Sequence, residues 1–180
     1  FGRWLYGETG GQAFYMVELL KTLLEQGLLT VRERKDGGWR IGFVSIAGGA
    51  LERMVLPGVR AVIAMRFKQI QPVARALAMA GAILGCNLPF KYLCYVANLN
   101  EREGEEALNE LLARHIFCKE GIHYFFVHDK VREVAYTDIA GVQRMELHAR
   151  ALEILHRESA PLSFQAYHAQ AAGLYESALY

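Results

Sequence analysis

Residues 116–129 read IFCKEGIHYFFVHD, and this stretch decides the fold of the second half of the chain. Ile116 to Lys119 and Ile122 to Val127 are short runs rich in aromatic and β-branched side chains, which favour β-strands. Glu120-Gly121 separates them with the backbone freedom that a tight turn requires. We therefore predict a β-hairpin, followed by a helix that starts at Asp129.

Helical patterns precede this hairpin. Apolar residues recur at three and four positions over 59–70 and over 73–84, with Pro72 between the two predicted helices. A short helix follows over 89–97. The spacing of Asn100 and Glu103 is that of a capping box, which predicts another helix start. That helix is expected to bury Ala107, Leu108, Leu111, Leu112 and His115.

Three helices followed by a hairpin is the order of elements in a winged helix. We predict this domain for residues 56–127, within a mainly α chain that carries small β-hairpins. A linker is expected over 45–55, because the run from Ser45 to Ala50 has two glycines and no clear period.

Residues 1–44 combine one helix with a predicted hairpin. The helix shows one apolar face and runs to about Gln26, where Gly27 is expected to end it. Extended segments over 28–34 and 39–43 flank Asp36-Gly37-Gly38, which is typical of a turn. The expected apolar face consists of Phe14, Val17, Leu20 and Leu24.

Residues 128–180 are expected to be helical. Helices are predicted from Asp129, beyond Gly141, from Pro161 and from Leu174, the last cut by the chain end. Short antiparallel helix pairs of this kind suggest the start of a helical-repeat array similar to tetratricopeptide repeats. The apolar positions of the helix beyond Gly141 are Met145, Ala149, Leu152 and Leu155.

The composition is that of a globular protein, with 53% hydrophobic residues, 22% charged residues and a net charge of +1. Generic attraction to nucleic acid or to anionic membranes is therefore not expected. The apolar run from Ala76 to Leu84 is much shorter than the ~20 residues of a membrane span. Three cysteines without paired spacing fit a reducing cytoplasm, and a first residue other than Met suggests a fragment.

No motif equips the chain for chemistry alone. Gly7 to Gly11 is rich in glycine but lacks the preceding strand, the Lys and the Ser or Thr of a phosphate-binding loop. The six histidines show no metal-ligand spacing, so no metal site is expected. A Ser-His-Asp triad assembles from distant positions, and sequence spacing does not reveal one.

Two segments allow both a functional and a purely structural interpretation. The helix after Asn100 would enter the major groove if the winged helix bound DNA, but its many glutamates oppose phosphate, and their simpler role is at the positive end of the helix dipole. His128-Asp129 joins the hairpin to a helix start. There the pair either caps the helix or places an imidazole beside backbone donors that attract phosphate.

Three segments carry a family likeness: residues 9–20, TGGQAFYMVELL; residues 56–63, LPGVRAVI; and residues 126–136, FVHDKVREVAY. The first is similar to the TGGNPFFLVELL segment of bacterial signal-transduction ATPases of the STAND class, found in large transcriptional regulators and in proteins with adenylate cyclase domains. The second resembles the linker into that family's winged helix, and the third resembles its F-x-H-D-x-x-R-E-x-x-Y signature. Arg144, Leu147 and His148 match an R-x-x-L-H pattern that follows.

The resemblance implies that residues 1–44 are the lid of a nucleotide-binding module whose Walker motifs lie upstream of Phe1. The chain itself would then hold no cofactor and hydrolyse no ATP, while the intact protein would bind ATP and ADP. His128 matches a histidine that contacts the β-phosphate of ADP. Gly11, Gln12 and Ala13 match a G-x-P segment near the nucleotide base, with Ala13 in place of the proline.

We therefore expect a non-catalytic regulatory module that couples nucleotide state to output through an intramolecular winged helix. Its partners would be the upstream nucleotide-binding module and a protein or small-molecule inducer at the downstream helical repeats, with no membrane and no direct DNA contact. The alternative is a DNA-binding winged-helix domain of a transcription factor.

Overall fold

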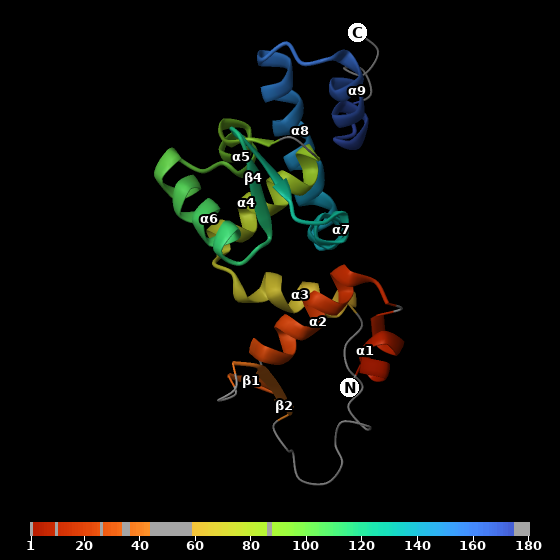
Figure 1. Ribbon diagram of the computed structural model, residues 1–180. Coiled ribbons are helices and arrows are strands. Elements are labelled where there is room, and N and C mark those ends of the chain that lie inside the picture. The colour runs from red at the N-terminus through yellow and green to blue at the C-terminus, as the bar shows by residue number, and fades with distance from the viewer. Residues whose placement is uncertain are drawn as a thin grey trace. The chain divides into compact units, whose positions relative to one another are not determined.

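The computed structural model describes residues 2–9, 11–25, 27–33, 37–43, 59–85 and 88–174. The chain is mainly α-helical with two small antiparallel sheets, which confirms the expected fold class (Figure 1). It forms two compact units, Phe1–Met65 and Arg66–Tyr180, and the division falls within α3 (Val59–Gln69). The predicted linker over 45–55 and the helix predicted beyond Leu174 lie outside the described residues. No described helix is both long and apolar enough to cross a bilayer.

The first unit contains two helices and a hairpin. In chain order these are α1 (Gly2–Thr9), α2 (Ala13–Glu25), β1 (Leu29–Glu33) and β2 (Trp39–Phe43). Gly27 has φ +68°, the left-handed conformation that ends α2 as predicted. Helix α1 was not predicted from the sequence.

The expected apolar face of α2 was wrong by about one position. The buried side chains are those of Glu18, Leu19, Thr22 and Leu23, whereas Val17 and Leu24 are exposed. Leu19 and Leu23 form the core of this unit with Leu5 of α1 and Leu29 of β1. Because α1 was not predicted, the sequence pattern did not show which side of α2 would be buried against it.

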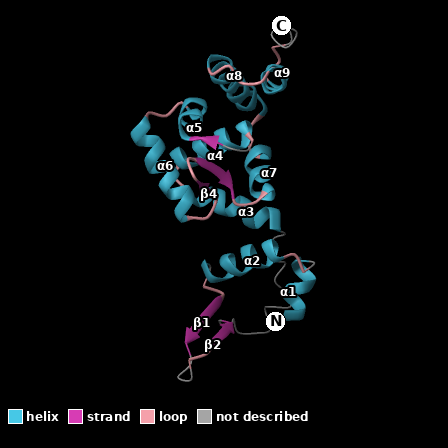
Figure 2. Cartoon of the chain, turned by 45° about the horizontal axis from the view of Figure 1, so that its top comes forward, coloured by secondary structure: helices cyan, strands magenta, loops and turns pink. Residues whose placement is uncertain are grey.

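The second unit contains the remaining helices and a three-stranded sheet. Its elements after α3 are α4 (Pro72–Leu84), β3 (Leu88–Pro89), α5 (Phe90–Ala97), α6 (Glu101–Ala113), β4 (Phe117–Glu120), β5 (His123–Phe126), α7 (Asp129–Thr137), α8 (Gly141–Arg157) and α9 (Leu162–Ala171). In both ribbon views the sheet lies between α6 and α7 (Figure 2).

The capping box of α6 is confirmed. The amide of Glu103 donates to Asn100 Oδ1 at 2.9 Å, and the amide of Asn100 donates to Glu103 Oε2 at 3.1 Å. Helix α6 buries Ala107, Leu108 and Leu111 as expected. The prediction that His115 is buried was wrong, because this residue follows the helix with φ +52° and points to solvent.

The predicted hairpin is present, with its turn shifted by one residue. Glu120 pairs with His123, so Gly121-Ile122 forms a two-residue connection. Gly121 has φ +59°, which suits the first position of a type II′ turn, and Ile122 is 78% exposed at the tip. Strand β3, which was not predicted, pairs with β5 on its other edge and gives the strand order β3-β5-β4.

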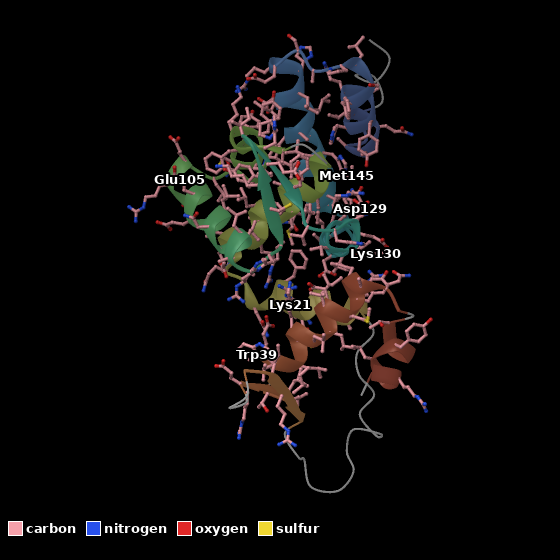
Figure 3. The ribbon with its side chains drawn as sticks, in the orientation of Figure 1. Lys21, Trp39, Glu105, Asp129, Lys130 and Met145 are labelled. Carbon is pink, nitrogen blue, oxygen red and sulfur yellow. The ribbon has the colours of Figure 1, made fainter. Side chains whose placement is uncertain are left out.

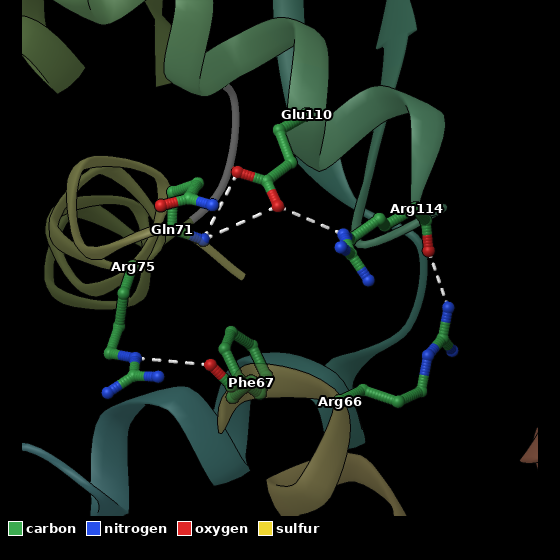
Figure 4. A network of polar contacts seen from close by, with 6 residues as sticks. All are labelled: Arg66, Phe67, Gln71, Arg75, Glu110 and Arg114. Atoms are coloured by element: carbon green, nitrogen blue, oxygen red, sulfur yellow. Dashed lines mark hydrogen bonds and ion pairs between the residues drawn. The ribbon is translucent and has the colours of Figure 1, made fainter. Parts of the chain in front are cut away.

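Helix α4 is the centre of the second unit. It contacts α5, α6, α7 and α8, and these contacts are possible because its buried residues are mostly alanine and glycine. Polar contacts at its start tie it to α6 (Figure 4). The backbone amide of Gln71 donates to the Glu110 carboxylate at 3.2 Å, and Arg114 Nε donates to the same carboxylate at 3.0 Å.

Helices α8 and α9 form an antiparallel hairpin. Contacts of His148 with His168, His156 with Gln165, and Met145 with Gly173 run in opposite chain directions. The apolar face expected for α8 was wrong, because the buried residues are Leu147, His148, Ala151 and Ile154 and Met145 is 49% exposed.

Gly104 lets α6 approach α5 closely. A Cβ at this position would lie 2.3 Å from Cys94 Sγ and 3.1 Å from the Phe90 ring. Gly104→Ala should therefore lower the free energy of unfolding by about 1–3 kcal/mol, because overpacking displaces these groups. The measurement is urea unfolding followed by circular dichroism. Gly141→Ala is the matched control, since no atom lies within 4 Å of its added Cβ. Equal stability of the two variants would contradict the close contact.

Candidate functional site

His128 caps helix α7. Its backbone is extended, with φ −161° and ψ 145°, and its Nδ1 accepts a hydrogen bond from the Lys130 amide at 3.0 Å. Because Nδ1 is an acceptor, the neutral ring carries its hydrogen on Nε2, which is a donor. The helix is therefore capped at this pair, but by His128, whereas Asp129, whose carboxylate was the expected cap, is the first residue of the helix.

The hairpin and the helix together hold this imidazole in place. The Val127 amide donates to the Ile116 carbonyl at 3.1 Å and extends the pairing of the hairpin to the residue before His128. Helix α7 buries Val131 and Val134 and packs against α4. The position of the ring therefore depends on the sheet on one side and on the core around α4 on the other.

Charged groups surround the start of α7. Asp129 is the first residue of the helix, and 94% of its side chain is exposed. Its negative carboxylate interacts favourably with the positive end of the helix dipole. Lys130 Nζ pairs with Glu133 at 2.6 Å, and Arg132 lies 3.9 Å from Asp129. Figure 3 shows the Asp129 and Lys130 side chains at this end of the helix. The charges at this helix start balance one another.

Gly11 and Gln12 directly precede α2, and Ala13 is its first residue. Gly11 has φ +76°, and a Cβ there would lie 2.5 Å from the Tyr6 ring, so this position requires glycine. The Gln12 carbonyl accepts from the Met16 amide at 3.0 Å, while the Gln12 and Ala13 side chains are exposed. These residues belong to the first compact unit and His128 to the second.

Helix α6 presents an acidic surface. Its residues 101–113 include five glutamates and one arginine, and that Arg102 pairs with Glu106 at 3.1 Å. Glu105 points away from the helix on its outer side (Figure 3). These glutamates have the same sign of charge as DNA phosphates, whereas lysine and arginine supply most of the affinity for the phosphate backbone.

Cys94 lies beside an open hollow of about 460 Å³ between α5 and α8, which Arg150 and Glu153 also line. Burial raises the pKa of the Cys94 thiol to about 11, with a further contribution from the Glu101 carboxylate. The thiol is therefore protonated at neutral pH, which argues against a nucleophilic role. Across the described ranges, no three His, Cys, Asp or Glu side chains gather as metal ligands would.

Two buried histidines form a pair that the sequence patterns did not reveal. His148 of α8 and His168 of α9 are 0% and 2% exposed, and their Nδ1 atoms lie 2.9 Å apart. The Tyr136 hydroxyl lies 3.2 Å from His148 Nε2, and the Tyr167 ring packs edge-on against both imidazoles. A usable signal was present, because Leu147, His148, Ala151 and Ile154 have helical spacing and place an imidazole on the apolar face.

Burial controls the protonation of this pair. It lowers the pKa of His168 to about 4, with a further contribution from His148, and it lowers the pKa of His148 with a further contribution from Arg144. Both rings are therefore neutral at physiological pH.

Comparison of the chain with known protein families and with curated proteins gives no match.

His128→Ala should remove the cap of α7 and lower the free energy of unfolding by about 0.5–2 kcal/mol, because the Lys130 amide loses its acceptor. His128→Asn should retain most of this stability, since asparagine accepts a hydrogen bond well at the same position. Urea unfolding of the wild type and both variants measures the difference. Equal losses in the two variants would show that the imidazole contributes something other than a cap.

Proposed function

We propose that the chain is a non-catalytic regulatory module of a STAND-type signal-transduction ATPase, in which the His128 segment couples nucleotide state to the orientation of a winged helix. The observation that carries this proposal is the direct passage from the hairpin through a capping imidazole into a helix packed on α4. The order α4, β3, α5, α6, β4, β5, with strand order β3-β5-β4, supports a winged helix over residues 56–127.

The chemistry of His128 suits a phosphate contact. Its Nδ1 is engaged by the Lys130 amide, so Nε2–H is the ring donor, and a hydrogen bond to an anionic phosphate is stronger than one between neutral groups. Losing this bond on nucleotide exchange would change the relative stability of two orientations of the winged helix, which is the form of many switching transitions. ATP and ADP are the cofactors of this proposal, bound by the intact protein.

The remaining elements have roles in the same proposal. Gly11, Gln12 and Ala13 would approach the nucleotide base, and residues 1–44 would form the lid of the upstream module, which is the intramolecular partner. The α8–α9 hairpin would begin a helical-repeat sensor for a protein or small-molecule inducer. The odd number of cysteines supports a location in the reducing cytoplasm.

The decisive test uses His128→Asn in the intact protein that the resemblance implies. This variant keeps the cap of α7 and removes the imidazole, so a loss of ADP affinity cannot be attributed to unfolding of the helix. We expect the dissociation constant for ADP, measured by calorimetry, to rise about tenfold or more, as loss of a hydrogen bond to a charged group requires. Unchanged ADP affinity and unchanged basal output would end the proposal.

A second experiment separates this function from DNA binding. Because the exposed face of α6 is acidic, a titration of the chain with random duplex DNA at low salt should show no binding that weakens steeply as salt is added. Fluorescence anisotropy of a labelled duplex measures this. A steep salt dependence would favour the alternative, a DNA-binding domain of a transcription factor.

A further inference from the structure

The contact between α8 and α9 depends on two imidazoles. Within the ten residues of α9, the buried side chains are those of His168 and Ala169. Alanine buries little area, so His168 is the largest fully buried side chain of α9, and the half-exposed Tyr167 adds an edge-on ring contact with His148. Its Nδ1 lies 2.9 Å from Nδ1 of His148, which is itself fully buried on α8.

A neutral pair satisfies this geometry. One hydrogen atom lies between the two Nδ1 atoms, donated by either ring, and the Tyr136 hydroxyl donates to or accepts from His148 Nε2 accordingly. The chain of hydrogen bonds therefore runs from α7 through α8 to α9. In either direction of this chain, one ring donates and the other accepts between the two Nδ1 atoms.

Within the part of the chain that the structure describes, no carboxylate is hydrogen-bonded to either imidazole or shifts its pKa, so none compensates a proton added to the pair. From α7 the groups nearby are Tyr136 and Arg132, from α8 Arg144, and from α9 Tyr167. Helices α4 and α5 pack on α8 through the apolar side chains of Ala80, Ile83 and Val96. Among the hydrogen bonds of the described residues, none joins a carboxylate to either imidazole.

Protonation should therefore disfavour the packed hairpin in two steps. A first proton places a charge in a buried site beside Arg144, which burial and repulsion both oppose. A second proton puts hydrogen on both Nδ1 atoms and removes the bond between them. The pKa of each ring is lowered in the packed state, so an open state binds protons first as the pH falls below about 6.5.

We propose that the α8–α9 hairpin is an acid-sensitive latch, in which the neutral pair of His148 and His168 holds α9 on α8 and protonation of the pair releases α9. The packing of α9 on α8 is its main contact with the chain, so release of this helix leaves the core around α4 intact. The latch does not depend on the proposed nucleotide contact of His128.

Hydrogen exchange measured by mass spectrometry tests the latch on the whole chain. After correction for the intrinsic pH dependence of exchange, the protection of residues 162–171 should fall about tenfold or more between pH 7.5 and pH 5. The protection of residues 101–113 in α6 should not change in parallel, because this helix does not contact the pair. Equal protection of α9 at both pH values would overturn the proposal.

Variants then assign the effect to the pair. In the double variant His148→Gln and His168→Gln, neutral amides replace both imidazoles, and the acid-induced loss of α9 protection should disappear. His156→Gln is the matched control, since His156 joins the same two helices through Gln165 at an exposed position, and it should keep the loss. A loss that persists in the double variant, or disappears in the control, would overturn the assignment.

A titration of the wild type followed by histidine NMR resonances keeps the test independent of whether the double variant folds. The His148 and His168 rings should remain neutral in the packed state until the pH is well below 6.5, and their resonances should then change together with the opening of α9. Protonation of both rings without any change in α9 would overturn the latch.

Discussion

The close approach of other elements to helix α4 is the constraint on which the second unit depends. Gly81 faces the sheet, where an added Cβ would lie 2.8 Å from the Phe117 ring, and alanines cover much of the remaining surface. Small side chains let α5, α6, α7 and α8 all meet one central helix. Both α6 and α7 pack on α4. The hairpin, the capping imidazole of His128 and the acidic surface of α6 are therefore held in fixed positions relative to one another.

Local signals predicted most of the secondary structure. The capping box at Asn100 and Glu103, the left-handed Gly27 and the glycine turn of the hairpin act over a few residues, and all three are present. Strand β3 has only two residues and exists because β5 offers it an edge, so no local pattern could reveal it. The buried face of each helix was less predictable, as α2 and α8 show. Which side of a helix becomes buried depends on the elements that pack against it, and these are distant in the sequence.

The candidate site was predictable only in part. His128 was identified from its place between hairpin and helix, and its capping bond follows from that place. The pair of His148 and His168 was missed because the rest of α8, a loop and the first part of α9 separate the two residues, and only the antiparallel packing of α8 and α9 brings their rings together. Helical spacing places one imidazole on an apolar face, but it does not name the partner.

The tip of the β4–β5 hairpin also has a practical consequence. Ile122 is 78% exposed, and the conformation of the turn is set by its neighbour Gly121. A fluorophore or spin label attached at position 122 would therefore stand outside the core without altering the strand register. Such a probe would report the approach of any neighbouring domain or macromolecule to the edge of the sheet.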